Sequence, residues 1–136
     1  MGSPAQTLNN YLDKNCWIKQ IDYNFDAESY QIFYKSGDHW TYLPELYDYT
    51  WEDGVATMHM EYIKGEKIDH RYNDIVLRFV AYTLIPEIIE WSSCQRLYPL
   101  IYSHNDIKLD NFLMSRNGRL ILLDIDSWGW SETFPK

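Results

Sequence analysis

Two short apolar runs, residues 112–115 and 120–123, constrain the fold more than any other feature of the sequence, because an Asn-Gly pair at 117–118 separates them. Asn and Gly tolerate the two positive φ angles of a type I′ turn, so the pattern predicts a tight β-hairpin. A hairpin returns the chain to its starting point. Asp124 should therefore lie beside Asn111, thirteen residues earlier in the sequence.

The loop that precedes this hairpin adds chemically useful side chains. Residues 103–111 read Ser-His-Asn-Asp-Ile-Lys-Leu-Asp-Asn, so Asp106 and Lys108 stand within five residues of Asn111. An Asp can accept a hydroxyl proton, a Lys can neutralise phosphoryl charge, and Asn and Asp oxygens bind hard cations such as Mg²⁺. Each residue alone is more often a structural cap or turn residue, but the set together indicates phosphoryl transfer.

This pattern resembles the catalytic loop of the protein-kinase-like fold superfamily, which reads His-x-Asp-x-Lys-x-x-Asn with a metal-binding Asp thirteen residues after the Asn. The resemblance implies a transfer of the γ-phosphoryl group from ATP, with Mg²⁺, to a hydroxyl. It assigns Asp106 and Lys108 to catalysis, and Asn111 and Asp124 to metal binding. His104 is expected to be a buried residue that braces the loop through hydrogen bonds.

The resemblance also assigns nucleotide-binding residues in the N-terminal half. Lys19 stands inside an apolar strand, residues 16–21, where the family's strand-borne Lys binds the α- and β-phosphates. A Lys in such a strand needs a partner, and Glu28 on the following helix is the natural one. The Glu61 carbonyl and the Ile63 amide resemble the hinge groups that bind the adenine edge.

The phosphoryl acceptor stays open between two classes. Lys108 favours a Ser or Thr hydroxyl of a protein, because such a Lys is frequent in Ser/Thr protein kinases. The Phe25-x-x-Glu28 pattern and Asp126 are more similar to aminoglycoside phosphotransferases and related small-molecule kinases. Asp126 would then be an additional metal or water ligand, although a helix or turn cap is an equal alternative.

Periodicity and turn residues predict the other elements. Strands are expected at 8–12 and 16–21 around a turn at 13–15, and at 46–51 and 55–60 around 52–54. Helices are expected at 25–34, capped by Asn24 or Asp26 and stopped by Gly37, and at 73–97, bent or divided by Pro86. Residues 64–67 are expected to be a polar linker.

The fold class expected from these elements is α+β, as a single, truncated protein-kinase-like domain spanning residues 1–136. Residues 1–63 would form an N-lobe-like half with a small antiparallel sheet and one helix. After the hinge, residues 64–136 would form a shortened, mainly helical C-lobe-like half with the catalytic hairpin. The sequence has no Gly-rich loop ahead of the first strands and no room for later helices after Lys136.

Two functions therefore remain open. An active minimal phosphotransferase is favoured by the presence of all the core site residues, Lys19, Asp106, Asn111 and Asp124. The short ends favour a non-catalytic kinase mimic that binds nucleotide or a partner kinase as a regulator or inhibitor. An oligomer or partner protein could cover the missing helices, with Trp128, Trp130 and Phe134 as candidate contact residues, although packing back onto the domain is the more expected fate.

Composition excludes several other classes. The formal net charge of −8 argues against nucleic-acid binding and suits a cationic acceptor or a basic partner. No apolar run reaches the roughly twenty residues of a membrane span, and no signal pattern begins the sequence. Cys16 and Cys94 are expected to be reduced core residues, and the four scattered His residues suggest no zinc site. The expected location is the cytoplasm, bacterial or that of a host cell.

Overall fold

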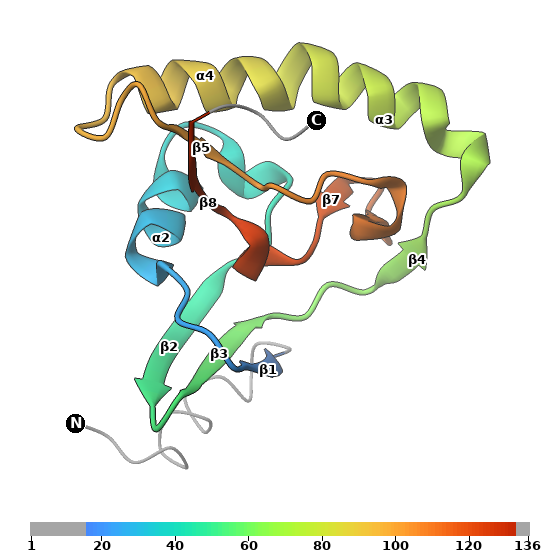
Figure 1. The fold of residues 1–136 in the computed structure, drawn as a ribbon. Coiled ribbons are helices and arrows are strands. Elements are labelled where there is room, and N and C mark those ends of the chain that lie inside the picture. Colours follow the sequence, from blue (N-terminus) through green and yellow to red (C-terminus); the bar gives the residue numbers. More distant parts are fainter. Residues whose placement is uncertain (1–15, 133–136) are drawn as a thin grey trace. The chain divides into compact units, whose positions relative to one another are not determined.

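The computed structural model describes residues 16–132, which combine short helices with small antiparallel sheets (Figure 1). The chain divides into two compact units, Met1–Lys64 and Gly65–Lys136. The strand expected at 8–12 and the side chain of Phe134 lie outside the described residues.

The first unit contains a three-stranded antiparallel sheet in the order β1-β3-β2. Its strands are β1 (Cys16–Ile21), β2 (Leu46–Glu52) and β3 (Val55–Glu61), which confirms the strand at 16–21 and the second hairpin. Asp53 and Gly54 connect β2 to β3 with φ angles of 52° and 76°. Two positive φ angles in a two-residue loop define a type I′ turn.

Helix α2 (Ala27–Lys35) begins two residues later and ends one residue later than the range 25–34 expected from the sequence. The Asp26 side chain accepts a hydrogen bond from the Ser29 N–H at 3.1 Å, so Asp26 is the N-cap. Gly37, with a φ of 54°, follows the C-cap residue Ser36. A left-handed glycine at this position commonly ends a helix.

The core of the first unit lies where α2 packs against the start of β2. Tyr30 and Phe33 of α2 are fully buried, and the Tyr30 hydroxyl donates a hydrogen bond to the Pro44 carbonyl at 2.5 Å. The Gln31 side chain reaches the Leu46 carbonyl at 3.3 Å. These contacts fix α2 relative to its own sheet.

In the second unit, the predicted long helix is one continuous rod (Figure 1). It comprises α3 (Asn73–Phe79), a π-helical turn η3 (Val80–Leu84) and α4 (Ile85–Ser93), after the short 3₁₀ helix η2 (His70–Tyr72). The expected end at Leu97 is wrong by four residues. Within residues 16–132, no helix has both the length and the apolarity needed to cross a bilayer.

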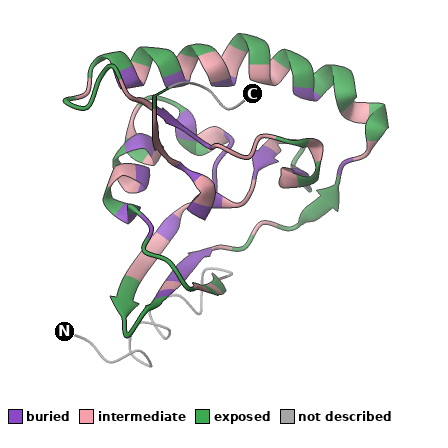
Figure 2. Cartoon of the chain, in the orientation of Figure 1, coloured by how far each residue is buried: buried purple, intermediate pink, exposed green. Residues whose placement is uncertain are grey.

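Pro86 neither divides nor stops this helix, because it lies in the first turn of α4 directly after the π-helical turn. A wider turn removes the clash between a proline ring and the carbonyl four residues earlier. Val76, Leu84 and Ile88 are buried, whereas Ile75 is 50% exposed, and Figure 2 shows buried and exposed residues along the length of this helix.

The polar linker expected at 64–67 is wrong for residues 65–67, which form a strand, although the boundary between the two units falls after Lys64. Gly65–Lys67 form β4, which pairs antiparallel with β6 (Phe112–Ser115), and β6 pairs with β7 (Leu120–Leu122). A Cβ atom on Gly65 would lie 2.2 Å from the Met114 carbonyl oxygen, so only glycine permits this approach. All three β4 residues are exposed, so no apolar pattern marks the strand.

The hairpin of β6 and β7 is confirmed, but its predicted turn type is wrong. Gly118 has a φ of 81°, whereas Asn117 is not among the residues with positive φ. The Gly118 N–H donates to the Ser115 carbonyl at 3.0 Å, and the Arg119 N–H donates to Ser115 Oγ at 2.9 Å. These bonds fit a type I turn followed by a left-handed glycine.

The tail of the second unit packs back onto its own unit. Strands β5 (Ile101–Ser103) and β8 (Gly129–Ser131) pair antiparallel. Trp128 is 3% exposed and stacks on Tyr102 with ring centroids 5.2 Å apart, while Trp130 stacks on Trp91 at 5.8 Å. Trp128 and Trp130 therefore serve internal packing.

The two cysteines are free thiols. Both were expected in the core, and neither lies there. Cys16 is half-buried at the start of β1, and Cys94 is exposed after α4. Burial still raises the pKa of the Cys16 thiol, which keeps it protonated and unreactive at neutral pH.

Replacing Gly65 with Ala should lower the free energy of unfolding by about 1–3 kcal/mol, because the added methyl group overlaps the β6 backbone. Urea titration followed by tryptophan fluorescence measures this change. Gly129→Ala is the matched control, since its Cβ would make an ordinary 3.6 Å contact with Asn105 Nδ2. Equal stability of the two variants would contradict the pairing of β4 with β6.

Candidate functional site

The predicted catalytic loop connects β5 to β6 and is tied down by Asn105. Asn105 has a φ of 66°, a left-handed conformation that Asn tolerates better than most residues. Its Nδ2 lies 3.0 Å from the Ser103 carbonyl, 3.2 Å from that of Ser127 and 3.3 Å from that of Gly129. The loop is thus anchored to the segment that follows Asp124, an anchor that the motif comparison did not identify.

His104 is fully buried and links the two ends of the site. Its Nε2 donates to the Leu123 carbonyl at 2.6 Å, and its Nδ1 accepts the Asp106 N–H at 3.2 Å. One nitrogen must donate and the other must accept, so the ring is neutral with its proton on Nε2. Trp128 meets the ring at nearly a right angle, with centroids 5.6 Å apart. The expectation of a bracing His104 is confirmed.

Burial lowers the pKa of His104, which keeps the ring neutral at physiological pH. The hydrogen bond to the Leu123 carbonyl and the nearby carboxylates of Asp124, Asp106 and Asp126 act in the opposite direction. Burial is the larger effect, so the pKa stays below its ordinary value.

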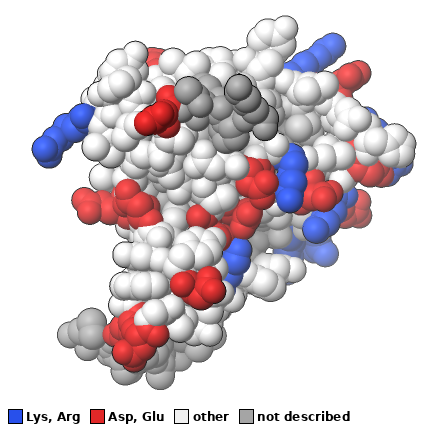
Figure 3. All heavy atoms as spheres, in the orientation of Figure 1, with Lys and Arg blue, Asp and Glu red and all other residues white. Residues whose placement is uncertain are grey.

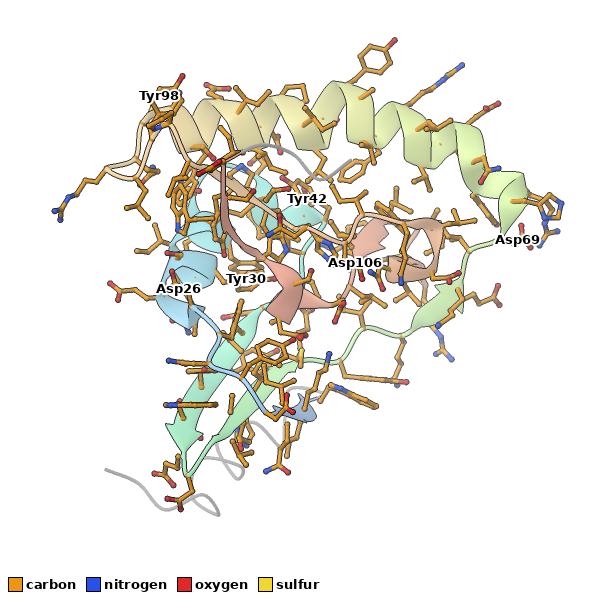
Figure 4. All side chains as sticks on the ribbon, in the orientation of Figure 1. Asp26, Tyr30, Tyr42, Asp69, Tyr98 and Asp106 are labelled. Carbon is orange, nitrogen blue, oxygen red and sulfur yellow. The ribbon has the colours of Figure 1, made fainter. Side chains whose placement is uncertain are left out.

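Asp106 and Asn111 are brought together directly. Asn111 Nδ2 donates to the Asp106 backbone carbonyl at 2.8 Å and to the Asp106 carboxylate Oδ2 at 3.1 Å. A short 3₁₀ turn, η4 (Leu109–Asn111), brings the amide back to the start of the loop. Asp106 is half-exposed beside the β6–β7 hairpin (Figure 4).

Lys108 contacts the same carboxylate. Its Nζ lies 3.7 Å from Asp106 Oδ2, and the two side chains are 56% and 44% exposed. An ion pair this exposed contributes less than about 1 kcal/mol to stability. Lys108 is therefore placed near Asp106 without being held rigidly.

Asp124 follows the hairpin beside Asn111, as the spacing predicts. The Leu123 N–H donates to the Asn111 carbonyl at 2.7 Å, so the next residue, Asp124, emerges next to the Asn111 backbone. Asp124 has a left-handed φ of 63° and precedes the turn η5 (Ile125–Ser127). Non-glycine residues in this conformation cluster at functional sites. Asp126, in η5, is 9% exposed.

The donor chemistry fits Mg²⁺ with few protein ligands. Among residues 16–132, no three His, Cys, Asp or Glu side chains form a cluster able to hold a metal ion. Mg²⁺ often uses only one or two protein carboxylates and completes its shell with substrate phosphates and water. Asn111 Nδ2 is engaged by Asp106, which leaves the Asn111 amide oxygen for a cation.

The nucleotide-binding candidates lie in the first unit. Lys19 is half-buried on β1, opposite the fully buried Met58 of β3. Glu28 lies in the first turn of α2 and is exposed, so its pairing with Lys19 stays a prediction.

Glu61 and Ile63 occupy the end of β3 and the extended segment after it. The Glu61 N–H donates to the Glu45 carbonyl at 2.8 Å, and Glu61 Oε1 accepts the Glu45 N–H at 3.1 Å. The Glu61 side chain thus has a structural role that sequence reasoning missed. The Ile63 N–H donates no hydrogen bond to any residue within 16–132.

His104→Gln should lower the free energy of unfolding by about 1–3 kcal/mol, because buried hydrogen-bonding groups lose their partners. The substitution should also remove the part of the pH dependence of the unfolding free energy that comes from His104. The folded-state pKa of His104 lies below its unfolded value of about 6.5, so the unfolded chain binds this proton more readily. The stabilisation is complete above the unfolded pKa and is lost as the pH falls below it.

Urea titrations of wild type and variant between pH 5 and 8 measure both effects. His70→Gln is the control, since His70 is exposed in η2. An unchanged pH slope in His104→Gln would contradict a buried, neutral ring.

No family model matches the chain, and no curated protein has a detectably similar sequence. Among solved structures, the chain is similar in fold to the kinase PK-1 of Cydia pomonella granulovirus, with a TM-score of 0.59 and 19% sequence identity. The match covers 88% of this chain and 45% of the viral protein, so this chain spans less than half of that kinase's length. An identity this low supports a common kinase-like fold and nothing more.

Proposed function

We propose that the chain is an ATP- and Mg²⁺-dependent phosphotransferase that moves the γ-phosphoryl group of ATP to a hydroxyl. The observation that carries this proposal is the hydrogen-bonded pair of Asp106 and Asn111, with Asp124 next to it through the Leu123–Asn111 backbone bond. The fold similarity to a viral kinase supports it. The acceptor is a Ser or Thr of a protein or an alcohol group of a small molecule.

Asp106 positions the acceptor hydroxyl and takes its proton. Asn111 Nδ2 donates a hydrogen bond to Asp106 Oδ2 at 3.1 Å, and no residue within 16–132 donates one to Asp106 Oδ1. Oδ1 is therefore the oxygen that receives the hydroxyl proton, and the half-exposed carboxylate is open to an acceptor. A positioned base of this kind contributes about 10²–10⁴-fold to the rate.

Lys108 neutralises charge on the transferred phosphoryl group. Its ammonium group is near Asp106 but exposed, so it can move toward a phosphate that lies beside the acceptor. His104 contributes by holding the Asp106 backbone N–H, which fixes the carboxylate at the start of the loop.

The Asn111 amide oxygen and the Asp124 carboxylate would hold Mg²⁺, with Asp126 as a weaker third candidate. Bound Mg²⁺ neutralises phosphate charge during the transfer. Asp106 engages the Asn111 amide nitrogen, and this bond orients the oxygen that remains for the cation.

For nucleotide binding, we propose that Lys19, with Glu28 as its partner, binds the α- and β-phosphates. The Glu61 carbonyl and the Ile63 amide bind the adenine edge. The Ile63 N–H donates to no residue within 16–132, which supports its assignment to the adenine edge.

The same residues could serve a protein that binds nucleotide and regulates a partner kinase without transferring phosphate. The grouping of Asp106, Asn111 and Asp124 favours transfer. A protein that only binds has no need of an oriented base with an oxygen left for a proton.

Asp106→Asn should lower phosphoryl transfer by at least about 10²-fold, because the amide cannot accept the hydroxyl proton. ATP binding should remain within about twofold of wild type, since Asp106 does not contact the nucleotide in this proposal. Transfer is measured with γ-labelled ATP, Mg²⁺ and a panel of basic proteins and cationic alcohols. Calorimetry measures binding.

Asp110→Asn is the matched control, since it makes the same charge change at an exposed position of the same loop. Equal transfer by Asp106→Asn and Asp110→Asn would contradict the role of Asp106. Wild-type protein that binds ATP but labels no acceptor would favour the regulatory function.

A further inference from the structure

The long helix of the second unit, formed by α3, η3 and α4, carries an exposed row of apolar side chains. Residues four apart on a helix are neighbours on its surface. Such a row consists of Leu77, Ala81, Ile85 and Ile89, of which only Ile85 is half-buried. Leu77 is 64% exposed and Ile89 is 44% exposed. Core packing therefore does not account for this apolar row.

The neighbouring row on the same helix is apolar in the middle and charged at its ends. It consists of Arg78, Tyr82, Pro86 and Glu90, and all four residues are exposed. Tyr82 alone is 80% exposed. Neither Arg78 nor Glu90 forms an ion pair within residues 16–132. In Figure 3, where only charged residues are coloured, the surface along this helix is largely white. Apolar surface of this kind marks an interaction site.

A second copy of the same helix, running antiparallel, is complementary to the apolar row. In a contact with two-fold symmetry, residue i of one copy meets residue j of the other, and j meets i. The register that sets Leu77 against Ile89 also sets Ala81 against Ile85, so every member of the row gains an apolar neighbour. The small side chain of Ala81 allows the two helix axes to approach closely.

The charges of the neighbouring row favour the same arrangement. In this register, Arg78 of each copy lies opposite the turn that contains Glu90 of the other copy, so two pairs of opposite charge form. A parallel arrangement would instead set Arg78 against Arg78. Helix pairs are selected between such alternatives by charges at their borders.

Charge also argues against other occupants. A basic partner would offer no opposite charge to Arg78, and an anionic lipid surface would offer none to Glu90. The formal net charge of −8 on each copy opposes self-association at long range. Salt screens this repulsion beyond about 8 Å at physiological ionic strength, so the local pairs decide.

We propose that two copies of this chain form a symmetric dimer by antiparallel pairing of this helix, with the apolar row at the centre and the Arg78–Glu90 pairs at the border. This surface is not the tail suggested by the sequence, whose Trp128 and Trp130 pack internally. The dimer does not depend on whether the chain transfers phosphate.

Sedimentation velocity of the full chain tests the dimer at concentrations up to about 100 μM. A reductant is present because Cys94 is exposed. Wild type should sediment as a dimer. Arg78→Glu and Glu90→Arg should each weaken association at least about 10-fold, because like charges then face each other twice. Leu77→Gln should weaken it as well, since it places a polar amide in the apolar contact.

The two charge variants together test the antiparallel register. When Arg78→Glu and Glu90→Arg proteins are mixed in equal amounts, every facing pair again has opposite charges, so a mixed dimer should form. The double variant Arg78→Glu/Glu90→Arg should dimerise with itself for the same reason. In a parallel pairing, neither single variant would lose affinity.

Arg116→Glu is the matched control, since it makes the same charge change at an exposed residue of the β6–β7 hairpin. It should leave the dimer intact, and circular dichroism confirms that each variant folds. A wild-type monomer at every concentration would overturn the inference. Dimers that Arg78→Glu and Leu77→Gln leave unchanged would exclude this helix, and a mixture that stays monomeric would exclude the antiparallel register.

Discussion

The buried ring of His104 is the constraint on which the candidate site depends. It joins the Leu123 carbonyl, at the end of the hairpin, to the Asp106 N–H, at the start of the loop. The bond from the Asp106 N–H needs an unprotonated Nδ1, and burial favours this neutral ring although three carboxylates lie near. The neutral ring therefore adds no positive charge next to Asp106 and Asp124.

The sequence allowed much of this site to be predicted, because hairpins have a regular geometry. Two apolar runs with a glycine between them bring residue 111 back to residue 124 whatever the turn type, and the Leu123–Asn111 bond agrees with this. The sequence also offered Asp26 as one of two candidate caps of α2, with Asn24 as the other, because a capping side chain acts within four residues. Local hydrogen bonds of this kind leave signals that a single sequence reveals.

Features that depend on partners distant in sequence could not be predicted. The three residues of strand β4 are all exposed, and only its pairing with β6, more than forty residues later, makes it a strand. The turn at 115–118 differs from expectation because Ser115 Oγ accepts the Arg119 N–H and donates to Asn117. In each case, a tertiary or side-chain contact outweighed a local preference.

The central claim is that Asp106, Asn111 and Asp124 surround one cation-binding point. Mn²⁺ can replace Mg²⁺ and broadens the NMR signals of nearby nuclei. With Mn²⁺ and a non-hydrolysable ATP analogue, the amide signals of residues 106, 111 and 124 should broaden first. Those of residues 116–119, at the far end of the hairpin, should broaden least. Equal broadening of both groups, or none at residues 106, 111 and 124, would contradict the account.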